Sequence, residues 1–229
     1  MLLLHPPAGI VGGDRLEINA VLEEEAHALM TTPGAGKFYG SSGPEASLTY
    51  RFDIGKKAAL EWLPQETIVF DGAKANTAMQ VSLDDEATFI GWEVLCLGRR
   101  SSGERFDSGF MGLSTRLERN GRPIWIERGR LEGGSALLES RAGLSGFSTI
   151  GTLLAAGKGL GAPLLAACRE IVPQEPDALH GLTVLPDLLV ARYLGHSSEA
   201  ARAWFTGLWR QIRPAMIGRD PHMPRIWNT

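Results

Sequence analysis

The sequence predicts a mainly β protein of many short strands, with about two α-helices packed near the C-terminus. Apolar and polar residues alternate in several segments between residues 15 and 161, which is typical of strands that bury one face. Glycine is abundant, with 28 residues, and separates these segments. Short strands with glycine turns favour a sandwich, a barrel or a β-solenoid. The sequence lacks a strict repeat, which disfavours a solenoid of identical coils.

The strand pattern is clearest at residues 16–23, 48–54 and 77–83, where every second residue is apolar. A hairpin is expected at residues 116–127, because Asn120-Gly121 stands between two strand-like segments. Both central residues of a type I′ turn need positive φ, which Asn and Gly tolerate best.

The stretch of residues 60–73 connects two of these strands and is rich in acids. Glu61, Glu66 and Asp71 lie within a largely apolar run, where a carboxylate is costly unless it is paired or solvated. One interpretation is a structural turn of the β body. The other is a chemical centre, in which Glu66 and Asp71 would act as the acid–base pair of a metal-dependent hydrolase.

The last third of the chain contains the helical signals. Residues 162–172 are rich in Ala and Leu, with Pro163 suited to a first helical turn. A second helix is expected after Ser197 or Ser198, either of which can cap it, and Pro214 is expected to end it. Its aromatic residues Trp204, Phe205 and Trp209 are expected in the core.

Residues 183–193 between the two helices could form a strand, although Pro186 favours an edge or an irregular segment. No polar linker separates this part from the rest of the chain. We therefore expect one domain over residues 1–229, with a β body at 1–161 and a mixed, helix-containing part at 162–229 packed on it.

Composition excludes several classes of function. The formal net charge is −3 and no block of Lys and Arg occurs, so a nucleic-acid partner is not expected. No apolar run approaches the ~20 residues of a membrane helix. Cys96 and Cys168 lie far apart without a partner spacing, which favours a reducing compartment, and we expect a cytoplasmic protein.

The sequence also lacks the motifs of a nucleotide-binding loop and of a zinc site. Residues 33–37 read Pro-Gly-Ala-Gly-Lys, but the first glycine of a P-loop is replaced by Thr31 and the hydroxyl residue after the lysine by Phe38. The histidines and cysteines have no spacing suited to a closed zinc site.

Three further acids stand in largely apolar surroundings. They are Asp14, Glu93 and Glu127. They either pair with neighbouring arginines and face solvent, or line a wet interior cavity where they contact a hard or borderline cation weakly. The residues alone leave both interpretations open.

Six blocks of the chain resemble, in the same order, the motifs of UreD-type urease accessory proteins, called UreH in some organisms. The similarity runs from Leu3 to the C-terminus. The blocks are HPPAGIVGGD at 5–14, TTPGAGKFY at 31–39, LEWLPQETIVFDGA at 60–73, GWEVLCLG at 91–98, IER at 126–128 and PRIW at 224–227.

This resemblance implies a β-helix-like stack with two helices near the C-terminus and a role without catalysis. Members of the family are scaffolds and metal conduits in the maturation of urease. They bind apo-urease and UreF, and UreF recruits the GTPase UreG, which delivers nickel. Nickel(II) would pass in transit, with no tightly bound cofactor. A pure adaptor that never contacts nickel is the alternative.

The family is also proposed to carry nickel through an internal, water-filled tunnel. Matching its acidic motif positions assigns the nickel path to Asp14, Glu93 and Glu127. The acids at 61, 66 and 71, together with His5, are second candidates for the tunnel wall or an interface. Carboxylate and water ligands hold a cation and still release it, whereas a Cys/His cage would trap it.

Two residues depart from the family pattern. Gly40 stands where the family commonly carries Arg after the KFY block, which removes one cation from that turn. Ala8 replaces a glycine, so this position is expected to tolerate negative φ.

Overall fold

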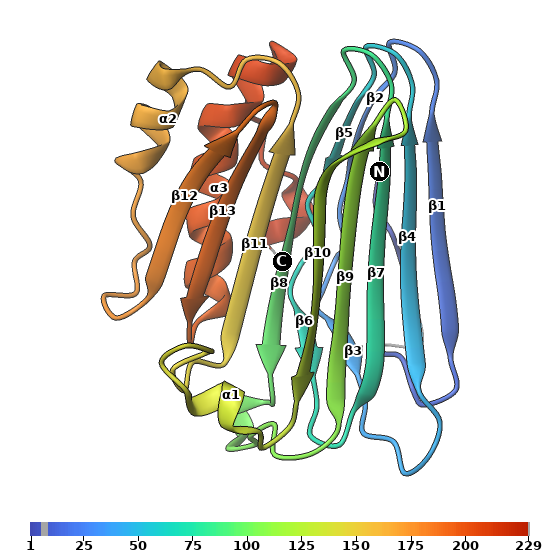
Figure 1. Ribbon diagram of the computed structural model, residues 1–229, viewed down its shortest axis with the longest axis vertical. Coiled ribbons are helices and arrows are strands. Elements are labelled where there is room, and N and C mark those ends of the chain that lie inside the picture. The colour runs from blue at the N-terminus through green and yellow to red at the C-terminus, as the bar shows by residue number, and fades with distance from the viewer. Residues whose placement is uncertain (6–8, 229) are drawn as a thin grey trace.

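The computed structural model describes residues 1–5 and 9–228, which form two facing β-sheets with the two longest helices on one outer face (Figure 1). The five-stranded sheet has the order β1 (Arg15–Leu22), β4 (Ala46–Ile54), β7 (Lys74–Leu83), β9 (Phe110–Arg119), β10 (Arg122–Glu132). Six strands of the eight-stranded sheet follow the order β12 (Leu179–Leu185), β13 (Leu188–Gly195), β11 (Thr149–Ala156), β8 (Thr88–Leu97), β5 (Ala59–Trp62), β2 (His27–Met30). The other two are short strands beside this row: β6 (Thr67–Val69) pairs with β8, and β3 (Gly36–Phe38) pairs with β6.

The first part of the chain is a solenoid-like stack. From β1 to β9 the chain passes back and forth between the two sheets, and each return adds a parallel neighbour. The pairs β1–β4, β4–β7 and β7–β9 are parallel in one sheet, as are β2–β5, β5–β8, β3–β6 and β6–β8 in the other. The prediction of a mainly β, β-helix-like stack is therefore confirmed.

The antiparallel strands come later. The β9–β10 hairpin turns at Asn120 and Gly121, whose φ angles are 49° and 74°, so the predicted turn is confirmed. Strand β11 pairs antiparallel with β8 and β13, and β13 pairs with β12. These three strands extend the eight-stranded sheet beyond β10, the last strand of the facing sheet (Figure 1).

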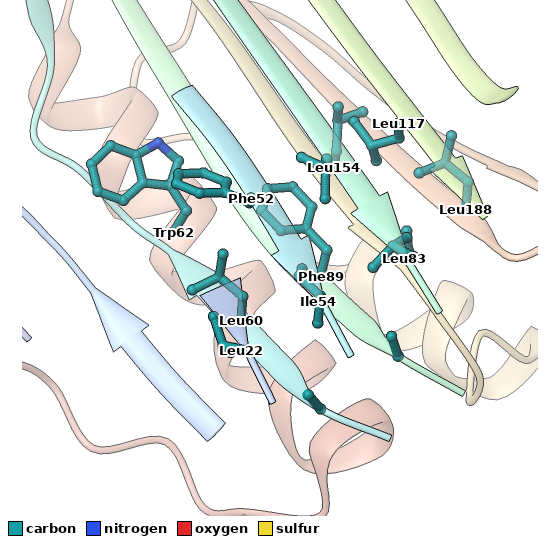
Figure 2. Packing of buried hydrophobic residues seen from close by; sticks show 14 of the residues in the cluster. Leu22, Phe52, Ile54, Leu60, Trp62, Leu83, Phe89, Leu117, Leu154 and Leu188 are labelled. Carbon is teal, nitrogen blue, oxygen red and sulfur yellow. The ribbon is translucent and has the colours of Figure 1, made fainter. Parts of the chain in front are cut away.

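The main core lies between the sheets. Figure 2 shows Phe52 and Ile54 of β4 against Leu60 and Trp62 of β5, with Phe89 of β8 beside them. Phe52, Leu60 and Phe89 are fully buried. Full burial of such a side chain contributes about 1.5–3 kcal/mol, so this cluster holds the two sheets together.

A second core lies on the outer face of the eight-stranded sheet. Helix α3 (Ser198–Ile217) packs there against β8, β11 and β13, and α2 (Ala162–Arg169) packs against α3. Trp204, Phe205 and Trp209 are buried in this core, as predicted. The other helical segments are short: the α-helix α1 (Ala136–Glu139) and the 3₁₀ helices η1 (Arg100–Ser102) and η2 (Arg225–Asn228).

Two expectations about the last third are corrected. Pro214 lies inside α3, which continues to Ile217 and ends at Gly218 with φ of 70°. The proline removes one hydrogen bond to Arg210, and Arg210 is exposed, so its carbonyl can be solvated. Residues 183–193 are not one strand, because the chain reverses after Pro186 at Asp187 (φ 59°) and forms the β12–β13 hairpin.

The expectation for Ala8 lies outside the described residues. Over the part of the chain that the structure describes, no helix has the length and apolar character needed to cross a membrane. The division into a β body and a helix-containing part stays a prediction.

Candidate functional site: a cavity between the sheets

Glu93 lies on β8, and its side chain lines two adjoining cavities between the sheets. The larger of the two measures about 80 Å³ and the smaller about 30 Å³. Ser114 and Thr115 of β9 contribute to both cavities from the five-stranded sheet. A single buried water needs ~10–15 Å³ of such volume, so both cavities have room for water beside Glu93.

The Glu93 carboxylate has no hydrogen-bond donor or ion-pair partner among residues 1–5 and 9–228. Enclosure between the sheets raises the pKa of Glu93 to about 7, and the nearby negative charge of Glu127 adds to this shift. Burial disfavours the charged form, and a like charge does the same. Glu93 is therefore an unpaired acid that is poised between its two protonation states near neutral pH.

Glu127 faces Glu93 from β10 in the opposite sheet and lines the 80 Å³ cavity. Its Oε1 lies 2.8 Å from Nη2 of Arg192 on β13. Arg192 also donates through Nη1 to Thr152 Oγ1 at 2.8 Å, and its guanidinium lies 5.6 Å from the ring centroid of Trp125. Glu127 thus has a basic partner, but not one of the neighbouring arginines considered from the sequence.

A third cavity, of about 390 Å³, lies beside the N-terminal strands. His5 lines it, together with Tyr50, which also lines the 30 Å³ cavity beside Glu93. Burial, followed by the charge of Glu93, raises the pKa of the Tyr50 hydroxyl. Glu93 lines both the 80 Å³ and the 30 Å³ cavity, and Tyr50 lines both the 30 Å³ and the 390 Å³ cavity, so the three are neighbours.

The groups that could bind a metal ion around the 80 Å³ and 30 Å³ cavities are oxygens rather than thiolates or imidazoles. Apart from the two acids, polar wall residues include Thr77, Ser114, Thr115 and Thr152. Among residues 1–5 and 9–228, no group of three or more His, Cys, Asp or Glu side chains is placed to hold a metal ion. Such walls fit a hydrated cation held weakly.

Asp14, the remaining first-choice acid, lies in a turn. Its Oδ2 accepts a hydrogen bond from the Val11 amide at 3.0 Å. It is not among the residues that line the three cavities. The structure therefore brings Glu93 and Glu127 together and leaves Asp14 apart.

Glu61 is fully buried and joins the sheet to α3. It accepts hydrogen bonds from Trp209 Nε1 at 2.6 Å and from Arg213 Nε at 3.0 Å. Its other oxygen lies 2.6 Å from His27 Nε2. Three partners around a buried carboxylate offset its desolvation, so this acid has a structural explanation.

Glu66 and Asp71 are engaged separately. Glu66 forms an ion pair with Arg202 of α3 at 3.0 Å. Of the two acids suggested as an acid–base pair, only Asp71 then has no basic partner among the described residues. Burial acts to raise the pKa of Asp71, but hydrogen bonds from Ser108 and Asp107 outweigh it and lower the pKa. An acid with a lowered pKa is a poor proton donor near neutral pH, so the hydrolase interpretation gains no support.

Three residues of this site are not among those predicted from the sequence. Tyr50 follows the ordinary alternation of its strand, and Thr152 resembles any strand threonine, so neither carries a signal. Arg192 is the only charged residue in the apolar run of residues 188–195, and an isolated arginine in a strand of that kind indicates a buried acidic partner.

The whole chain matches a known family. The model of the family described as UreD urease accessory protein covers residues 1–228. A protein named urease accessory protein UreD from Dechloromonas aromatica (strain RCB) is 54% identical over 231 residues, which is 100% of this chain and 80% of the relative. Proteins of the same name from Azoarcus sp. (strain BH72) and Janthinobacterium sp. (strain Marseille) are 50% and 46% identical, over 100% of this chain and 79% and 77% of their own lengths.

These names describe an accessory role rather than catalysis, which agrees with the expectation that the chain is not an enzyme. The family match spans both sheets, α3 and all of the cavity residues described above. The chain belongs to the UreD family of urease accessory proteins.

Proposed function

We propose that this protein is a scaffold and nickel conduit in the assembly of the urease metallocentre. In this role it binds apo-urease and UreF in the cytoplasm and meets UreG through UreF. The observation that carries the conduit is Glu93, an acid without a basic partner in the described part of the chain, which lies on a cavity wall opposite a second acid.

The chemistry of the cavity suits transit. Ni²⁺ binds carboxylate and water oxygens less tightly than thiolate or imidazole nitrogen. Two acids on facing sheets can replace part of the ion's hydration shell without enclosing it. The hydroxyls of Ser114, Thr115 and Thr152 can hydrogen-bond to the water that remains around the ion. Entry and release are then both possible, as a conduit requires.

The second candidate is an adaptor that positions its partners and never contacts nickel. The ion pair between Glu127 and Arg192 favours this alternative, because it gives one of the two acids a purely structural role. In an adaptor, Glu93 would be an unpaired acid without function.

Co-expression with apo-urease, UreF and UreG tests the proposal. Wild-type chain should co-purify with apo-urease and UreF, and the cells should gain urease activity. Glu93→Ala and Glu127→Ala should keep both complexes and lose most of the activity. Asp14→Ala should keep the complexes and the activity, because Asp14 lies away from the cavity. Glu17→Ala, which removes an exposed acid on β1, is the matched control.

The outcomes separate the two candidates. Intact complexes with full activation by the cavity variants would support the adaptor and sink the conduit. A chain that binds neither apo-urease nor UreF would overturn the whole proposal.

A further inference from the structure

Glu93, Thr152 and Arg192 lie side by side in the eight-stranded sheet. Glu93 of β8 is the register partner of Thr152 of β11, and Thr152 is the partner of Arg192 of β13. All three line the 80 Å³ cavity, together with Glu127 of the facing sheet. The guanidinium reaches back along this row and bonds Thr152 and Glu127 at 2.8 Å each.

This arrangement places the positively charged guanidinium of Arg192 in the space that a metal ion would occupy. Arg192 holds Oε1 of Glu127, so an ion that bridges Glu93 and Glu127 must share this carboxylate with the guanidinium or displace it. A divalent ion and the guanidinium together would bring three positive charges against at most two negative ones. Since like charges at short range repel strongly in a partly dry cavity, the two cations compete for the site.

Arg192 also has space to withdraw. Its side chain is 41% exposed, so the guanidinium can reach water. The next residue in the row is Gly181 of β12, which is the register partner of Arg192. Gly181 is exposed, and an added Cβ there would meet no described atom within 4 Å. The glycine side of the row therefore leaves room for the arginine to move out of the cavity.

We propose that Arg192 is a displaceable counterion that keeps the Glu93–Glu127 cavity a transient site for a divalent cation. This inference rests on the proposed conduit and adds the residue that sets how weakly the ion is held. Arg192 occupies Glu127 when no ion is present, yields it when an ion arrives, and recovers it as the ion leaves. It is a positioning residue, because it acts on the cargo through Glu127.

Calorimetric titration of the purified full-length chain with Ni²⁺ alone tests this. Removing the arginine frees Glu127, so Arg192→Met should bind Ni²⁺ at least about tenfold more tightly than wild type, a change of roughly 1.4 kcal/mol. Arg192→Lys keeps the charge and should bind close to the wild-type level. Arg192→Gln carries the same expectation as Arg192→Met if the methionine variant does not fold.

A double variant tests whether the effect of Arg192 acts through Glu127. The gain from Arg192→Met should disappear when Glu127→Gln is added, because the gain depends on the freed carboxylate. Circular dichroism of each variant should match wild type.

Two results would overturn the inference, and they differ in what they leave standing. If Arg192→Met binds Ni²⁺ no more tightly than wild type while Glu93→Gln weakens binding, the counterion role is wrong and the conduit stands. If Glu93→Gln leaves Ni²⁺ binding unchanged, the cavity is not a cation site, and both proposals fail.

Discussion

Glu93 and Glu127 face one cavity from opposite sheets, and of the two only Glu127 has a basic partner among the described residues. The pair is therefore unequal. Arg192 keeps Glu127 beside a positive charge, whereas burial and the charge of Glu127 raise the pKa of Glu93 to about 7. The unpaired acid is costly to keep ionised, and this cost can be measured.

Glu93→Gln should alter how stability depends on pH. The folded pKa of Glu93 is about 7 and lies above its ordinary 4.5. The folded state therefore binds more protons than the unfolded state between these values, and stability falls as pH rises through this window. Gln cannot ionise, so relative to wild type the variant should gain about 2 kcal/mol in free energy of unfolding between pH 5 and pH 8, because raising a pKa by one corresponds to ~1.4 kcal/mol.

Urea unfolding at several pH values between 5 and 8 measures this difference. A constant difference between wild type and Glu93→Gln across the range would mean that ionisation of Glu93 is not disfavoured. Glu17→Gln, which removes an exposed acid paired with Arg51, is the control for the loss of a surface carboxylate.

Glu61→Ala should destabilise the protein strongly. The change leaves Arg213 and Trp209 without their acceptor inside the interface of α3 with the sheet. Removing one partner of a buried ion pair costs about 3–5 kcal/mol. Urea unfolding measures the loss, and a shift of tryptophan emission to longer wavelength should accompany it.

The matched surface pair is Glu17 with Arg51, whose side chains are 55% and 44% exposed. Glu17→Ala should cost less than ~1 kcal/mol. Equal losses for Glu61→Ala and Glu17→Ala would show that the buried network does not hold α3 on the sheet.

Gly109→Ala should distort the turn that leads into β9. Gly109 has φ of 82°, and an added Cβ would lie 2.7 Å from the carbonyl carbon of Gly72 and 2.9 Å from that of Ala73. Both atoms belong to backbone, so the strain cannot be relieved by turning a side chain. We expect a loss of more than ~1 kcal/mol in thermal or urea unfolding.

Gly34→Ala is the control for this substitution, because an added Cβ there meets no described atom within 4 Å. It should change stability by less than ~1 kcal/mol. If the two alanine variants unfold alike, the crowding at Gly109 is relieved by movement of the turn.

The local structure was largely predictable from the sequence. Alternation predicted the long strands, because one face of each is buried. Asn120-Gly121 predicted its hairpin, because few residues adopt positive φ. The helix α3 was predicted to stop at Pro214, which was wrong because Met216 and Ile217 of the following turn still pack against the core, which offsets one lost hydrogen bond.

The site was only partly predictable. Glu93 and Glu127 were singled out by their apolar neighbours and by the family motifs, and they lie in one cavity. No local pattern could reveal that Arg192 would be the partner of Glu127, because they are 65 residues apart in sequence and meet only after β13 joins the sheet beside β11. Long-range pairing of this kind depends on sheet topology, which periodicity does not encode.

The most direct test of the conduit is the nickel content of urease. Apo-urease should be co-expressed with UreF, UreG and either wild-type chain, Glu93→Gln or the control Glu17→Gln, at limiting nickel. Purified urease is then assayed for bound nickel by atomic absorption, and the accessory complex is checked for integrity. We expect full loading with wild type and the control, and clearly reduced loading with Glu93→Gln in an intact complex. Equal loading with all three chains would contradict the proposal that nickel passes Glu93.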